Sequence, residues 1–147
     1  VEEFVHYYFG ELVEDKILQF MNLYDTYIAL NQQKDKDIMY DRYYKAEYNK
    51  YEDVNAGLII LDECKEMIAN SSLGDEEKEI LSVRIDRVRL TPLYMLMRNG
   101  SYYFADDLMK KNEITNEFFQ TCAKLNVIYY GEKLTIDSIK SQYGYNG

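Results

Sequence analysis

The sequence has no tryptophan, one proline and one histidine among its 147 residues. Because the sequence has no second histidine to act as a further metal ligand, His6 cannot anchor a zinc site of the usual kind. The two cysteines, Cys64 and Cys122, have no CxxC spacing, and cysteine is among the most buried residue types. We therefore expect two buried free thiols and no metal or other cofactor, although a disulfide stays open if the protein is exported.

Basic residues are also scarce, with 17 lysines and arginines against 26 acids and a formal net charge of −9. Nucleic-acid binding depends on basic side chains that neutralise phosphates, and anionic membrane surfaces attract basic segments. No apolar run approaches the 18 residues of a transmembrane helix. We therefore expect neither a nucleic-acid partner nor insertion into a membrane.

The sequence contains none of the common catalytic motifs, such as a nucleophile elbow, a phosphate-binding loop or a metalloprotease helix. Carboxylates are plentiful, but a glycosidase needs two of them facing each other across a cleft, roughly 5–9.5 Å apart. No pair is singled out by its spacing, and neighbours such as Asp106 and Asp107 are typical of a helix surface. We predict no catalytic residue in this chain, while activity of a longer parent protein stays open.

What the sequence does contain is a helical spacing of apolar residues along most of its length. A helix or a series of helical turns is predicted over residues 38–51, because tyrosines recur there at helical spacing. Gly10, residues 71–74 and Gly100 are the expected stops. The other helices are predicted over Glu2–Phe9, Glu11–Gln32, Asp53–Asn70, Asp75–Met97, Ser101–Lys111, Thr115–Asn126 and Ile136–Gln142, with Asp75, Ser101 and Thr115 as N-caps.

Together these patterns predict an all-α fold, a bundle of five to six helices with short loops. Pro92 lies inside an apolar stripe and removes one backbone donor, so we expect a kinked helix near Val88–Thr91. The β-branched and aromatic residues near 127–136 predict a minor extended segment. A chain of this size fits a single helical domain over 1–147 and buries enough surface to fold, roughly 68–70%.

Tyrosine is the most unusual component, at 16 residues. Tyr40, Tyr44, Tyr48 and Tyr51 follow helical spacing, as one stripe. Phenol rings can stack on the apolar face of a sugar or peptide, so this stripe is our candidate saccharide or partner contact. The favoured alternative is that the stripe packs its helix against the bundle, and the same two interpretations apply to Tyr102–Phe104.

Four arginines make the stretch from residue 84 to 98 locally basic, whereas Val1–Asp15 holds five acids and no base other than His6. The two stretches could meet in a network of ion pairs between helices, or the arginines could hold an anionic ligand. Pairing within the chain, or solvation, is the favoured interpretation. The arginines are Arg84, Arg87, Arg89 and Arg98.

Two passages resemble a known family. The run Glu3-Phe4-Val5-His6-Tyr7-Tyr8-Phe9-Gly10, continuing into Ile17-Leu18-Gln19-Phe20-Met21, is similar to the passage that opens the C-terminal helical region of bacterial glycoside-hydrolase-like proteins of unassigned function, related in architecture to α-glucuronidases. Arg84-Ile85-Asp86-Arg87-Val88-Arg89-Leu90-Thr91-Pro92-Leu93-Tyr94 resembles a later helix of that region. The resemblance extends to about Met97, and Phe9 stands where the pattern prefers tyrosine.

The resemblance implies a fragment that follows a (β/α)₈ barrel carrying the catalytic carboxylates. A start at Val1, without methionine and inside a predicted helix, also suggests a piece of a longer protein. The expected function is a non-catalytic accessory domain of a carbohydrate-active protein, packing on the barrel or mediating a homodimer. Its expected partners are the rest of the parent chain and polysaccharide, in a secreted or periplasmic setting.

Two alternatives remain open. One is a protein–protein interaction module unrelated to carbohydrate, which would expose an apolar groove or patch. The other is a small helical enzyme, which would need a deep pocket with converging carboxylates of raised pKa.

Overall fold

The computed structural model describes residues 1–32, 49–130 and 134–147, with the side chains of residues 24–32 outside the description. The described part is all-helical and contains no strand, as the periodicity predicts. Its seven helices are α1 (Glu2–Phe9), α2 (Glu14–Gln32), α3 (Tyr51–Asn70), α4 (Asp75–Arg98), α5 (Gly100–Tyr103), α6 (Leu108–Lys124) and α7 (Ile136–Tyr143).

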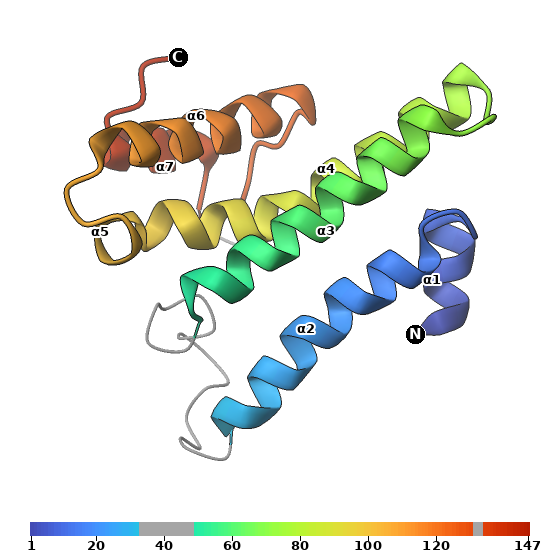
Figure 1. The fold of residues 1–147 in the computed structure, drawn as a ribbon. Helices are drawn as coiled ribbons and strands as arrows, with labels where there is room; N and C mark the ends of the chain where they lie inside the picture. Colours follow the sequence, from blue (N-terminus) through green and yellow to red (C-terminus); the bar gives the residue numbers. More distant parts are fainter. Residues whose placement is uncertain (33–48, 131–133) are drawn as a thin grey trace.

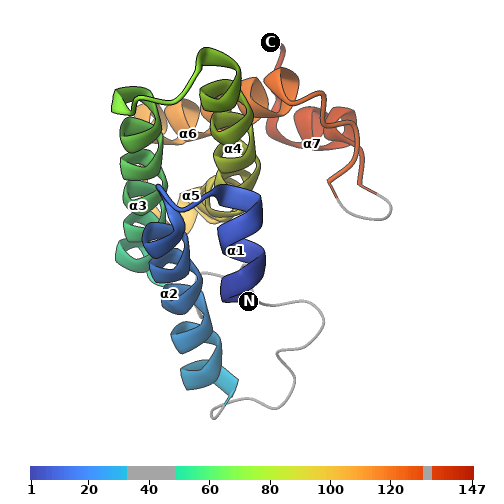
Figure 2. The same cartoon turned by 90° about the vertical axis from the view of Figure 1, so that its right-hand side faces the viewer.

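The long helices α3 and α4 form the middle of the bundle (Figure 1). The loop between them is short, and Ser71 donates its hydroxyl to the carbonyl of Ile68 at 2.7 Å. Helices α1 and α2 lie on one side of this pair and α6 and α7 on the other, as the turned view in Figure 2 also shows. The predicted all-α bundle is therefore confirmed, although the described residues form seven helices rather than five to six.

The buried apolar residues form two cores that share α3 and α4. The N-terminal core combines α1, α2, the second half of α3 and the first half of α4: Val5, Phe9, Val13, Ile17, Phe20, Ile60, Leu61, Cys64, Ile68, Leu81 and Ile85. The C-terminal core combines the first half of α3, the second half of α4, α6 and α7: Val54, Leu58, Leu90, Leu93, Tyr94, Met95, Leu96, Met97, Ile114, Phe118, Phe119, Cys122, Leu125, Ile136 and Ile139.

The stretch of α4 from Pro92 to Met97, in its second half, is buried on all sides. Pro92 lies inside the helix, and Figure 1 shows this half of α4 leaving the line that its first half follows beside α3. The phenol of Tyr130 donates to the carbonyl of Leu90 at 3.3 Å, within this part of the helix. The expected kink thus turns α4 from one core into the other.

Several helix starts and N-caps differ from the predictions. Gly10 has φ 81°, and one turn follows it, so α2 begins at Glu14 rather than at Glu11. Gly74, not Asp75, is the N-cap residue of α4. The predicted helices starting at Ser101 and Thr115 are wrong.

The sequence from 100 to 124 instead forms the four-residue α5 and the long α6. A turn with Ala105 at φ 45° separates the two helices. Asp107 then caps α6, because its carboxylate accepts from the Lys110 N–H at 2.9 Å. Thr115 lies inside α6, where its hydroxyl donates to the Lys111 carbonyl at 2.8 Å and so does not cap a new helix.

The predicted extended segment near 127–136 is present in reduced form. Tyr129 and Thr135 make one isolated antiparallel bridge. The N–H of Tyr130 donates to the Leu134 carbonyl at 2.7 Å, and that of Ile136 donates to the Ile128 carbonyl at 2.9 Å. Thr135 then caps α7 by accepting from the Ser138 N–H at 3.1 Å.

The N-terminal core can be tested by truncating a central side chain. Leu61→Ala and Ile85→Ala should each lower the free energy of unfolding by roughly 2–5 kcal/mol, because both side chains are fully buried in the N-terminal core. Urea unfolding followed by circular dichroism measures the change. Ile59→Ala is the matched control, since Ile59 lies on the same helix as Leu61 and is 51% exposed. A loss below about 0.5 kcal/mol for either buried residue would show that the helix faces are misassigned.

Candidate functional site

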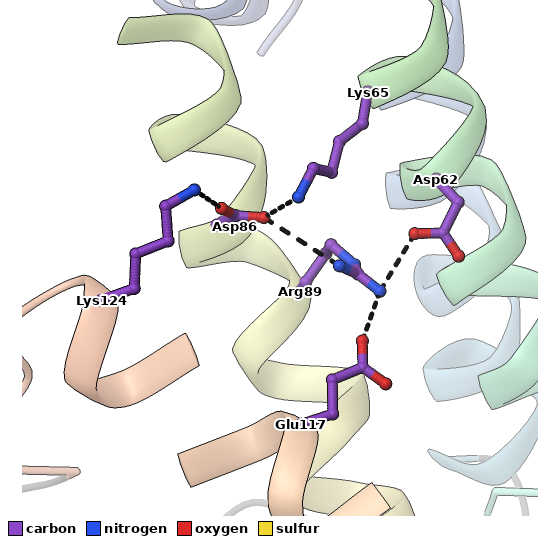
Figure 3. Close-up of polar contacts among 6 residues, drawn as sticks. All are labelled: Asp62, Lys65, Asp86, Arg89, Glu117 and Lys124. Carbon is purple, nitrogen blue, oxygen red and sulfur yellow. Dashed lines mark hydrogen bonds and ion pairs between the residues drawn. The ribbon is translucent and has the colours of Figure 1, made fainter. Parts of the chain in front are cut away.

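A cluster of six charged side chains lies where α3, α4 and α6 meet (Figure 3). Its centre is Asp86 on α4, which is only 3% exposed. One carboxylate oxygen accepts from Lys65 of α3 at 2.5 Å, and the other accepts from Lys124 of α6 at 2.8 Å. Asp86 therefore connects three helices through one carboxylate.

Arg89, one turn further along α4, makes the second connection between the same helices. Its Nη2 lies 3.0 Å from Asp62 of α3 and 2.6 Å from Glu117 of α6, and its Nη1 lies 4.0 Å from Asp86. Its Nε is buried without a hydrogen-bond partner. Three acids and three bases make the cluster neutral, so the chain's excess negative charge lies elsewhere.

The ionisation of Asp86 is set by two opposing effects. Burial raises the pKa of a carboxyl group, but the hydrogen bonds and charges of Lys124 and Lys65 outweigh it, so the pKa of Asp86 falls below its usual 3.8. A general acid near neutral pH would need the opposite shift. We therefore interpret this cluster as a structural junction that keeps three charged helices in register.

The arginine prediction is partly met and partly corrected. Arg89 does pair with acids within the chain, but these lie on α3, α4 and α6 rather than in Val1–Asp15. Arg84 reaches the predicted segment by other means, donating to the Tyr8 carbonyl and lying 4.5 Å from the centre of the Tyr8 ring. Arg98 donates to the Tyr94 hydroxyl at 3.2 Å, and Arg87 is exposed.

An open hollow lined by tyrosines lies where the start of α3 meets α5. Its volume is about 240 Å³, and its walls are formed by Lys50, Tyr51, Glu52, Tyr102 and Tyr103. The rings of Tyr51 and Tyr103 have their centres 6.0 Å apart, and those of Tyr102 and Tyr103 lie 5.9 Å apart. We call this feature the tyrosine hollow.

The hollow joins two groups that the sequence singled out separately. Tyr51 is the one member of the predicted stripe within the described residues, whereas Tyr40, Tyr44 and Tyr48 lie outside them. Tyr51 is half-buried against the C-terminal core and also contacts Phe104, with ring centres 5.5 Å apart. It therefore combines the packing role that the sequence favoured with a place at the surface.

Helix α1 presents a second aromatic surface. Val5 and Phe9 fill the N-terminal core, while Phe4 is 60% exposed and Tyr7 is 77% exposed. Val1 is exposed beside them. We call Val1, Phe4 and Tyr7 the outer face of α1.

His6 links α1 to the first residue of α2. Its Nδ1 lies 2.8 Å from Glu14 Oε2, across the turn at Gly10. The hydrogen bond and charge of Glu14 raise the pKa of His6 above its usual 6.5, with a smaller contribution from Glu11. The lone histidine of the chain thus takes part in an ion pair when it is protonated.

The cysteines are both buried and free, as expected, and they lie in different cores. Burial raises the pKa of Cys64 and of Cys122 to about 11. Within the described ranges no three His, Cys, Asp or Glu side chains are grouped as a metal site. None of the described helices combines the length and apolar character needed to cross a bilayer.

Comparison of the chain with protein-family models, curated proteins and solved structures found no match. The resemblance to glycoside-hydrolase-like proteins therefore remains an expectation from the two sequence passages.

The role of Asp86 can be tested with Asp86→Asn. Breaking a buried ion pair costs roughly 3–5 kcal/mol, and the partial exposure of both lysines should reduce the loss to about 2–4 kcal/mol. Because its pKa is lowered on folding, the contribution of Asp86 is present above about pH 4 and disappears as the pH falls through the lowered value. Urea unfolding at pH 7 and pH 3 measures both effects.

The control for this variant is Glu113→Gln, which breaks the exposed pair between Lys110 and Glu113 and should cost less than about 1 kcal/mol. Equal losses for the two variants would contradict a special role for the buried carboxylate.

The pair at the α1–α2 turn can be tested by titrating His6 in an NMR experiment. The pKa of His6 should lie above 6.5 in the native chain and fall towards 6.5 in Glu14→Gln. The pair stabilises the fold fully below the unfolded pKa, and this effect is lost as the pH rises through the folded value. Glu52→Gln, at the start of α3, should leave the titration unchanged, and an equal shift in both variants would contradict the assignment.

Proposed function

We propose that this chain is a non-catalytic accessory domain that packs against another domain of a carbohydrate-active protein through the outer face of α1. The single observation that carries the proposal is that α1 holds apolar side chains on both sides. One side fills the N-terminal core, and the other exposes Phe4 and Tyr7 to solvent. A helix of eight residues with aromatic groups on its solvent side is typical of an interface.

The outer face is held in place by a stack of side chains. The rings of Phe4 and Tyr8 lie nearly parallel, 5.3 Å apart at 11°. The Tyr8 ring also packs against the guanidinium of Arg84 from α4. A surface that is ordered before binding loses less conformational entropy on docking, so this stack favours an interface role.

Acidic side chains lie beside the face on α1. Glu2 and Glu3 are exposed next to its aromatic residues. A polar rim around an apolar centre is the usual arrangement of protein interfaces. The partner surface should therefore be apolar at its centre, with basic groups opposite Glu2 and Glu3.

The carbohydrate-active parent is supported by the sequence resemblance, and one contact joins the two passages that carry it. The two passages that resemble the glycoside-hydrolase-like family include α1 and part of α4, and they meet where Arg84 donates to the Tyr8 carbonyl. Residues 76 positions apart thus form one unit. This contact supports a shared structural role for the two passages, in the region that follows the barrel in that family.

A second candidate is a protein–protein interaction module unrelated to carbohydrate. The same outer face of α1 favours it, because an exposed aromatic cluster fits a second protein as well as a domain of the same chain. The two candidates differ in where the partner comes from, which an experiment can decide.

The experiment compares hydrogen exchange of α1 in the isolated chain and in the full-length gene product. Docking of the outer face should slow exchange in α1 at least tenfold in the longer protein, which corresponds to about 1.4 kcal/mol of added protection. The double variant Phe4→Ser with Tyr7→Ser should remove this added protection. The control is Leu108→Ser with Met109→Ser, two exposed apolar residues at the start of α6.

Identical α1 exchange in the two proteins would contradict the proposal. Protection that rises with the concentration of the isolated chain, together with a dimer mass in solution, would instead show that the outer face of α1 mediates a homodimer.

A further inference from the structure

The tyrosine hollow lies away from the outer face of α1. Figure 1 shows α5 and α1 at opposite sides of the molecule, with the α3–α4 pair between them. Docking through α1 therefore leaves the hollow unused. Its walls come from two sequence positions about 50 residues apart, one at the start of α3 and one in α5.

The aromatic walls meet at an angle. Tyr102 is 72% exposed, and its ring is nearly perpendicular to that of Tyr103, at 81°. The Tyr103 hydroxyl donates to the Asn49 carbonyl at 2.6 Å, so this ring is fixed. The hollow thus offers one exposed ring face for stacking and one ordered ring as a side wall.

The polar groups of the hollow include both a donor and an acceptor. Lys50 and Glu52 flank Tyr51 in the sequence and line the same hollow, with charges that cancel. Lys50 is also the N-cap residue of α3, and its side chain makes no capping hydrogen bond to that helix.

We propose that the tyrosine hollow binds one neutral pyranose ring of an oligosaccharide. The apolar face of the sugar stacks on Tyr102, while its hydroxyl groups donate to Glu52 and accept from Lys50. At about 240 Å³ the hollow is smaller than a usual drug-sized pocket of roughly 300–1,000 Å³, which suits a single sugar ring with the rest of the chain in solvent.

The charges around the hollow favour a neutral ligand over an anionic one. Glu52 and Asp53 occupy the first turn of α3, where they offset the positive end of the helix dipole. The chain as a whole carries a net charge of −9, which also disfavours approach of an acidic sugar.

The test is a titration of the full chain with cellohexaose, xylohexaose and mannohexaose, followed by amide chemical shifts in NMR spectra. At least one of these neutral sugars should shift the amides of residues 50–52 and 101–103, with a dissociation constant on the order of 1 mM, as expected for one shallow subsite. Tyr102→Ala should weaken this binding by about threefold to tenfold, the range that corresponds to one aromatic contact.

The matched control is Tyr129→Ala, because Tyr129 is a similarly exposed tyrosine outside both the hollow and the outer face of α1. Its binding constant should equal that of the native chain, and amide spectra of both variants verify that they fold. No shift with any of the three sugars would overturn the proposal, as would equal weakening by the two variants. Shifts of the same amides with free L-tyrosine, but with no sugar, would overturn it in favour of an amino-acid site. None of these results depends on whether α1 docks.

Discussion

The buried carboxylate of Asp86 is the constraint on which the rest of the fold depends. A charged group that is removed from water is strongly destabilising unless other charges and donors surround it. Asp86 meets that demand with Lys65 from α3 and Lys124 from α6, and Arg89 repeats the pattern one turn later (Figure 3). The observed placement of α3, α4 and α6 satisfies all of these charged groups together.

This junction lies at the border between the two cores. On α4, Ile85 belongs to the N-terminal core and Leu90 to the C-terminal core, with Asp86 and Arg89 between them. The apolar residues on either side supply most of the stabilisation, since burial of apolar area is the dominant favourable contribution to folding. The charged cluster instead fixes the register of the helices, and this leaves the exposed surfaces, the outer face of α1 and the tyrosine hollow, for binding.

Much of the fold was predictable from apolar spacing. The ends of α1 and the Pro92 kink follow from Gly10 and from the missing proline donor, which are local effects. The start of α6 was not predicted, because Ser101 and Thr115 are both favourable N-cap residues when judged from the sequence alone. In the structure a turn at Ala105 separates α5 from α6, and Asp107 is the N-cap residue of α6. Which of several possible N-cap residues is used depends on how the following helix packs, and the spacing of apolar residues does not predict that packing.

The candidate sites were predictable only in part. The sequence singled out Arg89 and both tyrosine groups, but it did not indicate that Tyr51 and Tyr102 share a hollow, because no local pattern relates α3 to α5. Asp86 was missed although a signal exists. Its position begins a second apolar stripe on α4, continued by Leu90, Leu93 and Met97, and an acid on such a stripe is buried.

Native-state hydrogen exchange tests most directly whether the junction joins the two cores into one cooperative unit. The slowest amides near Ile17, in the N-terminal core, and those near Phe118, in the C-terminal core, should exchange with the same opening free energy and the same dependence on denaturant. A lower opening free energy for the amides of one core, with a smaller denaturant slope, would contradict the account, because that core would then unfold without breaking the bonds to Asp86.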